Sequence, residues 1–302
     1  MPLEIRTFSH HCRSKYGEGV GKVPVDTGLI CPNRKNGGCI YCRAASFTPS
    51  CLEAGDSVAI QVEKAKGFLL KGRFKKYFAY FQQETCTAAP VEELLHLFNG
   101  LLADSDCVGL ILSTRPDAVH EELLDPFAML IKKAGKDCLF ELGVQTCHDS
   151  SLTLLNRNHT YADFIRAVRL LQSYGCYEVG AHLIFGIPDE SVEDMLTSVK
   201  EICSLKIDAL KFHHLQVIKD TPLHKMYQDN LVETFSLQSY FDLLLRVLPL
   251  VPQDVTIHRL WATAHPDLLV APKWNVLASH LSQQLRALMK ERGLYQGKHA
   301  ME

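Results

Sequence analysis

The segment CPNRKNGGCIYC, residues 31–42, places three cysteines in one short glycine-rich loop. Seven residues separate Cys31 from Cys39, and two separate Cys39 from Cys42. A structural zinc site takes four protein ligands, and a cubane iron–sulfur cluster held by thiolates alone also takes four. Three thiolates without a fourth cysteine in the loop therefore predict a cluster that keeps one iron open, where a ligand can bind and be activated.

The composition is that of a globular protein from a reducing compartment. The chain has 302 residues, 47% of them hydrophobic and 22% charged. Its formal net charge of −2 is close to zero and therefore does not indicate any class of binding partner. It contains no run of about 18 apolar residues, and its first residues lack the apolar core of a secretory signal. Its 11 cysteines are odd in number and scattered outside the loop, which argues against a disulfide framework. We therefore expect a cytoplasmic protein without a membrane span.

After the cysteine loop, apolar segments typical of buried strands alternate with amphipathic helices. Strands are expected at residues 23–29, 75–82, 107–114, 138–145, 177–186 and 207–216, and helices at 56–71, 90–102, 117–134, 149–156, 160–174 and 191–205. Such alternation indicates parallel βα units. Six units, without the two needed to close a ring, predict an α/β fold with a partial (β/α)6 barrel; a doubly wound sheet is the alternative. In both folds ligands bind at the carboxyl ends of the strands, where the cysteine loop lies.

Three regions are expected along the chain. Residues 1–22 are a polar lead-in, for which we expect a hairpin, and residues 23–220 form the partial barrel. Residues 221–302 contain expected helices at 236–249 and 276–292 and a strand-like segment, DVTIHRL. No linker rich in Pro, Gly or Ser precedes this last region, so we expect a C-terminal α/β extension that packs beside the barrel and helps to close its open side.

The cysteine loop resembles that of the radical S-adenosylmethionine (SAM) superfamily, in which three cysteines hold a [4Fe-4S] cluster. The wide first spacing matches subfamilies with an expanded loop, and Tyr41 fits the aromatic residue that normally precedes the last cysteine. The further matching motifs are HCRSKYG (11–17), YFQQETCTAAP (80–90), STRPD (113–117), ELGVQT (141–146), LLNRNHT (154–160), HLIFGIPDES (182–191) and KFHHLQVIKDTPL (211–223). Together they resemble a bacterial group of radical SAM proteins related to the Elongator catalytic subunit.

This resemblance implies an activity and its cofactors. It implies that Cys31, Cys39 and Cys42 hold the cluster, and that SAM fills the open iron and is cleaved reductively to a 5′-deoxyadenosyl radical. A reductase, a flavodoxin or a ferredoxin is then needed as the electron donor. Kinship with Elongator implies the wobble-uridine side chain of tRNA as the substrate. The alternatives are a small-molecule substrate, as in the porphyrin branch, and a zinc-stabilised binding module without catalysis.

The resemblance also implies which residues contact SAM. Gln82 follows the second strand and is expected to pair with the methionine moiety, and Gln145 with the ribose or the carboxylate. Arg157 matches the position that pairs with the methionine carboxylate, since a guanidinium suits a carboxylate fork; a solvated arginine at a helix end is the alternative. Ser113 and His182 lie where ribose or adenine contacts occur.

Four residues are candidates for catalysis. Lys211 and His213 share one face of the last barrel strand, and a lysine inside an apolar strand is costly unless it is paired. They either face the barrel interior as functional groups or form a satisfied structural pair. Cys86 and Cys147 follow the second and fourth strands, and burial as small hydrophobic residues is the alternative for both.

Two further groups are candidates for contact with the substrate. In the extension, His258, Arg259 and Trp261 either meet the substrate or pack in the core, and Trp261 offers a stacking face. Near the end of the first barrel helix there is a basic run, which is either a phosphate-binding patch for tRNA or a solvated face. Its members are Lys64, Lys66, Lys71, Arg73, Lys75 and Lys76.

Overall fold

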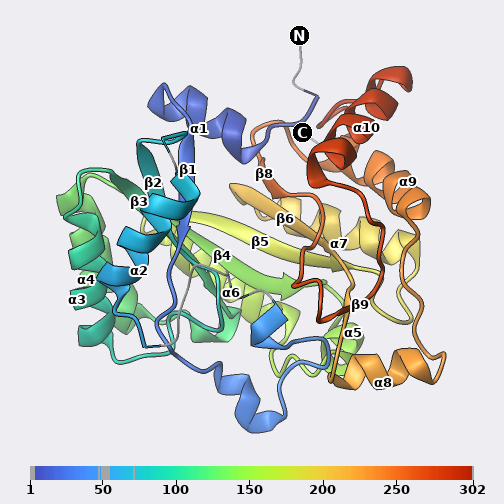
Figure 1. Cartoon of the computed structure of the whole chain (residues 1–302), viewed down its shortest axis with the longest axis horizontal. Coiled ribbons are helices and arrows are strands. Elements are labelled where there is room, and N and C mark those ends of the chain that lie inside the picture. Colours follow the sequence, from blue (N-terminus) through green and yellow to red (C-terminus); the bar gives the residue numbers. More distant parts are fainter. Residues whose placement is uncertain (1–3, 47, 49–54, 71, 301–302) are drawn as a thin grey trace.

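The computed structural model describes residues 4–46, 48, 55–70 and 72–300, which form an α/β half-barrel (Figure 1). One curled sheet holds seven parallel strands in the order β1-β2-β3-β4-β5-β6-β8. These strands are β1 (Val20–Pro24), β2 (Lys76–Phe81), β3 (Cys107–Thr114), β4 (Asp137–Gln145), β5 (Glu178–Phe185), β6 (Ala209–His214) and β8 (Thr256–Arg259). The predicted fold class, a partial barrel with a C-terminal extension, is thus confirmed, with one strand more than expected.

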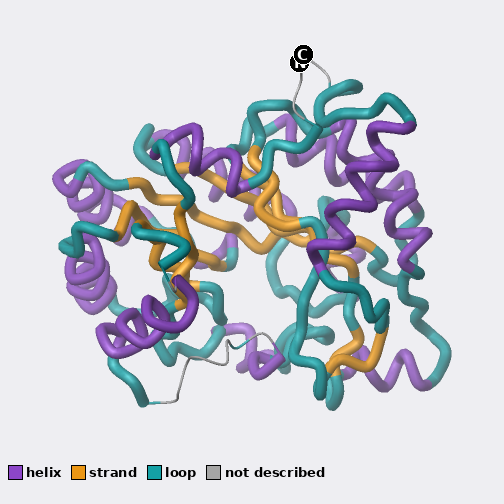
Figure 2. The backbone as a smooth tube through the Cα atoms, turned by 45° about the horizontal axis from the view of Figure 1, so that its top comes forward, coloured by secondary structure: helices purple, strands orange, loops and turns teal. Residues whose placement is uncertain are grey.

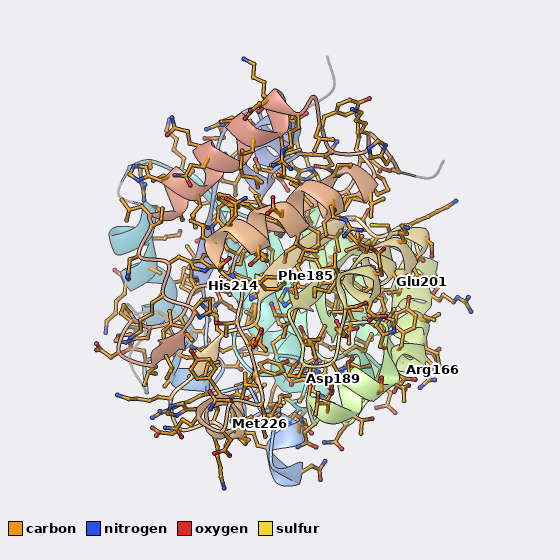
Figure 3. The ribbon with its side chains drawn as sticks, turned by 90° about the vertical axis from the view of Figure 1, so that its right-hand side faces the viewer. Arg166, Phe185, Asp189, Glu201, His214 and Met226 are labelled. Carbon is orange, nitrogen blue, oxygen red and sulfur yellow. The ribbon has the colours of Figure 1, made fainter. Side chains whose placement is uncertain are left out.

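Helices cover the outside of this sheet (Figure 2). They are α2 (Val58–Ala65), α3 (Val91–Leu102), α4 (Glu121–Ala134), α5 (Asp149–Leu154), α6 (Tyr161–Ser173) and α7 (Val192–Ser204). Each long helix buries an apolar face, as Phe98 of α3 and Phe127 of α4 show. In Figure 3, Phe185 lies in the interior, whereas Arg166 and Glu201 lie on the exposed side of their helices. No helix in the described ranges has the length and apolarity that a membrane crossing requires.

The seventh strand comes from the C-terminal region. β8 pairs in parallel with β6, so that Arg259 lies beside Lys211 in the sheet. The region also holds α8 (Pro222–Gln228), α9 (Leu237–Val247), α10 (Ala278–Glu291) and the strand β9 (Leu269–Ala271), which pairs antiparallel with β7 (Val217–Ile218). The N-terminal segment joins β8 from the other side, because Ile257 N–H donates to the Arg6 carbonyl at 2.7 Å. Both ends of the chain therefore support the open edge of the half-barrel.

The hairpin expected within residues 1–22 is wrong, because helix α1 (Phe8–Tyr16) occupies this segment. Its first turn is capped by the Thr7 hydroxyl, which accepts the His10 N–H at 3.3 Å, and Gly17 ends it at a φ of +75°. Strand β1 also ends earlier than predicted. The chain turns at Gly28, which has a φ of +71° and donates its N–H to Asp26 at 2.8 Å.

Gly109 in β3 supplies a test of the close packing between strands. A Cβ at this position would collide with the Asp137 carbonyl and the Phe78 ring, whereas nothing lies within 4 Å of a Cβ on Gly100 in α3. Gly109→Ala should lower the free energy of unfolding by about 1–3 kcal/mol. The control Gly100→Ala should raise it by about 0.5–1 kcal/mol, since alanine favours the helix. Urea denaturation measures both, and equal values for the two variants would contradict this close approach.

Candidate functional site

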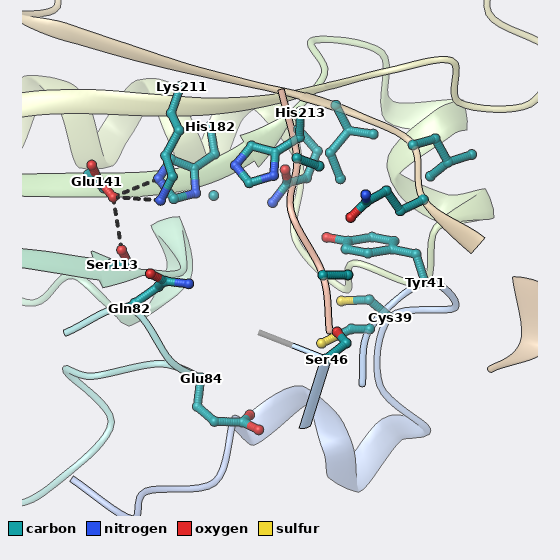
Figure 4. A pocket seen from close by; sticks show the side chains of 18 of the residues that line it. Cys39, Tyr41, Ser46, Gln82, Glu84, Ser113, Glu141, His182, Lys211 and His213 are labelled. Carbon is teal, nitrogen blue, oxygen red and sulfur yellow. Dashed lines mark hydrogen bonds and ion pairs between the residues drawn. The ribbon is translucent and has the colours of Figure 1, made fainter. Parts of the chain in front are cut away.

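One cavity of about 230 Å³, partly open to solvent, lies at the carboxyl ends of the strands (Figure 4). All three cysteines of the loop line it. So do the expected SAM contacts and two of the catalytic candidates, namely Tyr41, Gln82, Ser113, Gln145, Arg157, His182, Lys211 and His213. The fold therefore gathers into one site residues that lie far apart in the sequence.

The other two catalytic candidates do not line this cavity. Cys86 is buried in the main core, and burial raises the pKa of its thiol far above the ordinary value. Cys147 is half-buried, and its sulfur accepts a hydrogen bond from the Ser198 hydroxyl at 3.3 Å. In the extension, Trp261 belongs to the core, whereas Arg259 lines the cavity.

The cysteine loop is held in shape by the LLNRNHT segment, which follows α5. The Asn156 amide donates to the carbonyls of Asn36 at 2.9 Å and Gly38 at 2.6 Å. The Asn158 amide donates to Asn33 Oδ1 at 2.7 Å, and Asn33 in turn donates to the Asn156 carbonyl at 2.7 Å. Asn156 and Asn158 have φ values of +54° and +52°, a region that asparagine enters more readily than most residues. These hydrogen bonds of the asparagines hold the cysteine loop, and with it the thiols, in position.

Cys39 is the best-supported thiolate of the three. Its sulfur accepts hydrogen bonds from Asn33 Nδ2 at 3.4 Å and from Arg157 Nη1 at 3.3 Å. Burial opposes ionisation, but the Arg157 guanidinium outweighs it and lowers the pKa of the Cys39 thiol. Arg157 also donates from Nη1 to the Tyr41 hydroxyl at 3.3 Å and from Nη2 to the Gly143 carbonyl at 2.5 Å.

The other two cysteines lie in less uniform surroundings. Cys31 Sγ accepts from the Thr85 hydroxyl at 3.2 Å, and the Cys31 N–H donates to Glu84 at 3.0 Å. Glu84 also pairs with Arg34, whose Nη2 lies 4.0 Å from Cys42 Sγ. Burial, and then the charge of Cys39, raise the pKa of the Cys42 thiol to about 12. Cys42 is therefore a thiol at pH 7, and binding a metal would take its proton.

The donor set of the loop fits a cluster with three thiolate ligands. Cys31, Cys39 and Cys42 line the same cavity, and Cys31 and Cys39 each accept a hydrogen bond that stabilises the anionic form. Within the described ranges, no three His, Cys, Asp or Glu residues are grouped as ligands of one metal ion. The cavity beside the thiols leaves room for the further ligand that an open iron would bind.

Glu141 is not among the predicted site residues, yet it is the centre of the cavity's other end. Its Oε2 accepts from His182 Nε2 at 2.9 Å and from the Ser113 hydroxyl at 3.1 Å, and lies 3.2 Å from Lys211 Nζ (Figure 4). The Tyr80 hydroxyl donates to the same oxygen at 3.0 Å. A signal was present in the sequence, because Glu141 and Lys211 are both charged residues inside apolar strands and each needs a partner.

The second oxygen of Glu141 also meets basic groups. Oε1 lies 3.0 Å from His258 Nδ1 and 3.8 Å from Lys22 Nζ. Burial alone would raise the pKa of Glu141, but Lys211 and Lys22 hold it well below its usual range. Burial lowers the pKa of Lys211 to about 7, with Glu141 opposing the shift. Burial, followed by the charge of Lys211, lowers the pKa of His182 to about 4, so this imidazole is neutral at pH 7.

Comparison with protein families matches almost the whole chain. Residues 27–202 match the model of the Radical SAM superfamily, and residues 207–291 match that of the Radical_SAM C-terminal domain. The chain is 33% identical over 297 residues to the uncharacterized protein YtqA of Bacillus subtilis, covering 97% of this chain and 91% of that protein.

Two further similarities involve archaeal proteins. A tRNA uridine(34) acetyltransferase of Methanocaldococcus jannaschii is 27% identical over 195 residues, which cover 64% of this chain and 34% of that protein. The structure of Methanocaldococcus infernus Elp3 lacking residues 1–46 has a TM-score of 0.69 and 22% identity, covering 92% of this chain and 64% of that chain. This chain thus spans less than two thirds of that structure, and the likeness shows a shared fold.

Removing the charge of Glu141 tests its central position. Glu141→Gln leaves the buried Lys211 and the half-buried Lys22 without a counter-charge, and it should lower the free energy of unfolding at pH 7 by about 3–5 kcal/mol. The folded-state pKa of Glu141 lies well below its ordinary 4.5, so its contribution is present above about pH 4.5 and is lost as the pH falls. The difference in the free energy of unfolding between the parent and the Glu141→Gln protein should therefore become smaller as the pH falls below about 4.5, as measured by urea denaturation.

Two controls sharpen this measurement. Glu201→Gln changes an exposed carboxylate on α7 and should stay within about 0.5 kcal/mol of the parent protein. Adding Lys211→Met to Glu141→Gln removes a cation together with its partner and should recover part of the loss. A Glu141→Gln protein as stable as the Glu201→Gln protein would show that the carboxylate is not what balances these cations.

Proposed function

The chain belongs to the radical SAM superfamily and is a radical SAM enzyme, and we propose that it modifies the wobble-uridine side chain of a tRNA. Membership of the family implies a [4Fe-4S] cluster and SAM as cofactors, for which Cys31, Cys39 and Cys42 are the proposed ligands. Held by these residues, such a cluster supplies an open iron for SAM and the electron for its reductive cleavage. Since the chain belongs to this family of enzymes, the alternative of a zinc-stabilised binding module without catalysis is excluded.

The residues of this chain prepare the cysteine end for that role. Arg157 and Asn33 favour the thiolate of Cys39, the form that binds iron. We propose that Gln82, Gln145 and Arg157 orient SAM. Arg157 uses both Nη1 hydrogens on Cys39 and Tyr41 and one Nη2 hydrogen on Gly143, so one Nη2 hydrogen is left for the methionine carboxylate.

Ser113 and His182 link this end to Glu141, since both donate to its carboxylate. In the proposed site they lie along the ribose and adenine of SAM, and their bonds to Glu141 fix the direction of both side chains. The buried Gln145 has a φ of +74° at the end of β4, an uncommon conformation for a glutamine. Backbone strain of this kind is typical of functional sites, where the surroundings hold a residue in place.

The tRNA substrate is supported by relatives, and in particular by the archaeal protein named for uridine 34 of tRNA. The basic run adds less support than the sequence suggested. Lys64 pairs with Asp56, Lys66 with Asp104, and Lys76 with Glu18, while Lys71 lies outside the described residues. Arg73 and Lys75 are exposed, but they precede β2 and therefore lie at the amino ends of the strands, away from the cavity.

Other basic residues lie on the side of the cavity. Lys35 is exposed on the cysteine loop itself, and Lys219 is exposed just after β7. The two segments are joined, because Arg43 Nη1 donates to the Lys219 carbonyl at 3.1 Å. We propose that this rim, rather than the distant run, meets the phosphates nearest to the uridine that enters the cavity.

The cofactor chemistry is tested with a ligand variant. The parent protein, reconstituted with iron and sulfide without oxygen, should bind iron and should form 5′-deoxyadenosine from SAM and a reductant. Cys39→Ala should lose the visible absorption of the cluster and all 5′-deoxyadenosine. Cys176→Ala changes a cysteine that does not line the cavity and should retain both. A Cys39→Ala protein with an intact cluster and full activity would refute the ligand assignment.

The substrate is tested by mass spectrometry of tRNA nucleosides from cells with and without the gene. A modified uridine should be missing in the deletion strain and restored by the parent gene, but not by Cys39→Ala. An unchanged nucleoside profile would contradict the tRNA proposal and favour a small-molecule substrate.

Two matched double charge-reversal variants locate the surface that binds tRNA. Lys35→Glu with Lys219→Glu should weaken tRNA binding by roughly tenfold at moderate salt, because two phosphate contacts are replaced by repulsion. Arg73→Glu with Lys75→Glu changes the same charge at the other end of the barrel and should leave binding within about twofold. Binding that falls only in the second pair would instead support the basic run predicted from the sequence.

A further inference from the structure

The end of the cavity around Glu141 carries more positive than negative charge. Lys22 and Lys211 lie 3.8 Å and 3.2 Å from its carboxylate oxygens, and Arg259, whose charge is permanent, stands beside Lys211 in the sheet. The other titratable groups there are four imidazoles and one phenol, belonging to His182, His213, His214, His258 and Tyr80. All five are neutral at pH 7, because burial lowers the pKa of each imidazole, which favours the uncharged ring, and raises the pKa of Tyr80 well above 10.0, which favours the uncharged phenol.

Arg259 is the cation in this group that lacks a partner. It lines the cavity and stands beside Lys211 in the paired strands β6 and β8. In contrast to the ammonium group of Lys211, its guanidinium forms no hydrogen bond or ion pair with any residue in the described part of the chain. A guanidinium has five N–H donors and cannot lose its charge, so one that faces a partly buried cavity without a partner is poised to bind an anion.

A second polar atom without a partner lies in the same cavity. His213 lies two residues after Lys211, on the same face of β6, and also lines the cavity. Its Nε2 is buried and has no hydrogen-bond partner within the described residues. Since buried polar atoms are nearly always paired, this atom also indicates a polar group that arrives with a ligand.

This end of the cavity is separate from the cysteine end. Figure 4 shows Cys39 and Tyr41 on one side and Glu141, Lys211 and His182 on the other, with His213 between them. The proposed SAM contacts Ser113 and His182 reach into this end, so we assign to the substrate the groups that SAM is not expected to use, namely Lys211, His213 and Arg259. The excess of positive charge is on the substrate side.

We propose that Arg259, with Lys211 and His213, forms a subsite for an anionic group of the substrate, either a carboxylate or a phosphate diester. The assignment rests on the proposed function, since it names a property of the substrate at the same site. The anion would accept hydrogen bonds from the Arg259 guanidinium and from Lys211, and would supply the negative charge that Glu141 alone does not provide. A neutral substrate would leave both cations unbalanced, so the subsite selects charged substrates.

Small anions test this subsite without tRNA or turnover. Binding of acetate, dimethyl phosphate and the neutral acetamide to the reconstituted protein is measured by saturation-transfer NMR at pH 7. One of the anions should bind and acetamide should not; the tighter anion identifies the source as a carboxylate or a phosphate diester. Arg259→Gln should lower the affinity for that anion by about tenfold, as the loss of a charge-assisted hydrogen bond predicts. Arg259→Lys should restore part of the affinity, because it keeps the charge without the fork.

Two controls distinguish a substrate subsite from a general charge effect and from a contact with SAM. Arg246→Gln removes an exposed arginine that pairs with Glu193 and should leave anion binding unchanged. S-adenosylhomocysteine should bind the Arg259→Gln protein as tightly as it binds the parent. If its affinity fell as much as that of the anion, Arg259 would be assigned to the methionine carboxylate and the proposal would be overturned. Anion binding that is absent from the parent protein, or that persists in Arg259→Gln, would also overturn it.

A measurement on the unaltered protein covers the case in which Arg259→Gln fails to fold. The bound anion should raise the pKa of Lys211, since a nearby negative charge favours the ammonium form, and NMR of the lysine side chain reports this shift. A Lys211 that titrates identically with and without the anion would refute the subsite. Because none of these measurements involves tRNA, they can succeed when the nucleoside profile shows no change, and the two proposals fail independently.

Discussion

The Arg157 guanidinium joins the cysteine loop to the barrel. One edge of it donates to Cys39 and Tyr41, and the other donates to the Gly143 carbonyl in β4. Ile40 and Tyr41 pack against a hydrophobic cluster, and the Arg157 side chain and the asparagines that flank it in the sequence supply the polar contacts that hold the rest of the loop. The same residue sets both the charge of a thiol and the position of a whole loop, and this dual role explains why it is buried although charged.

A second polar cluster, around Glu141, places charged side chains in the barrel interior, where an apolar core would have none. Buried charges of this kind seldom add stability over a hydrophobic core of the same size. Their presence in the cavity wall is better understood as preparation for a ligand, since the groups are already oriented and already stripped of water. The cost is offset by the network of hydrogen bonds from Ser113, Tyr80 and His182.

Much of the fold was predictable because its signals are local. The cysteine spacing, the apolar strands and helix ends such as Gly135 can each be read within a few residues. Ser113, His182 and Lys211 were predicted as site residues, but Glu141, which joins them, was missed. The members of this cluster come from β1 to β6 and from β8, and only the register of those strands brings them together. The ion-pair partners of the basic run were not visible in the sequence for a similar reason: Asp104 and Glu18, which pair with Lys66 and Lys76, lie elsewhere in the chain. Helix α1 was missed because its apolar face is weak and its caps decide it.

The origin of β8 has a consequence for biogenesis. The cysteine loop is translated well before β8, the strand that carries His258 and Arg259. A nascent chain therefore displays its thiols long before the opposite wall of the cavity exists. The complete binding site forms only when β8 docks beside β6, so the part of the cavity that we assign to the substrate is completed later in synthesis than the part that holds the cysteines.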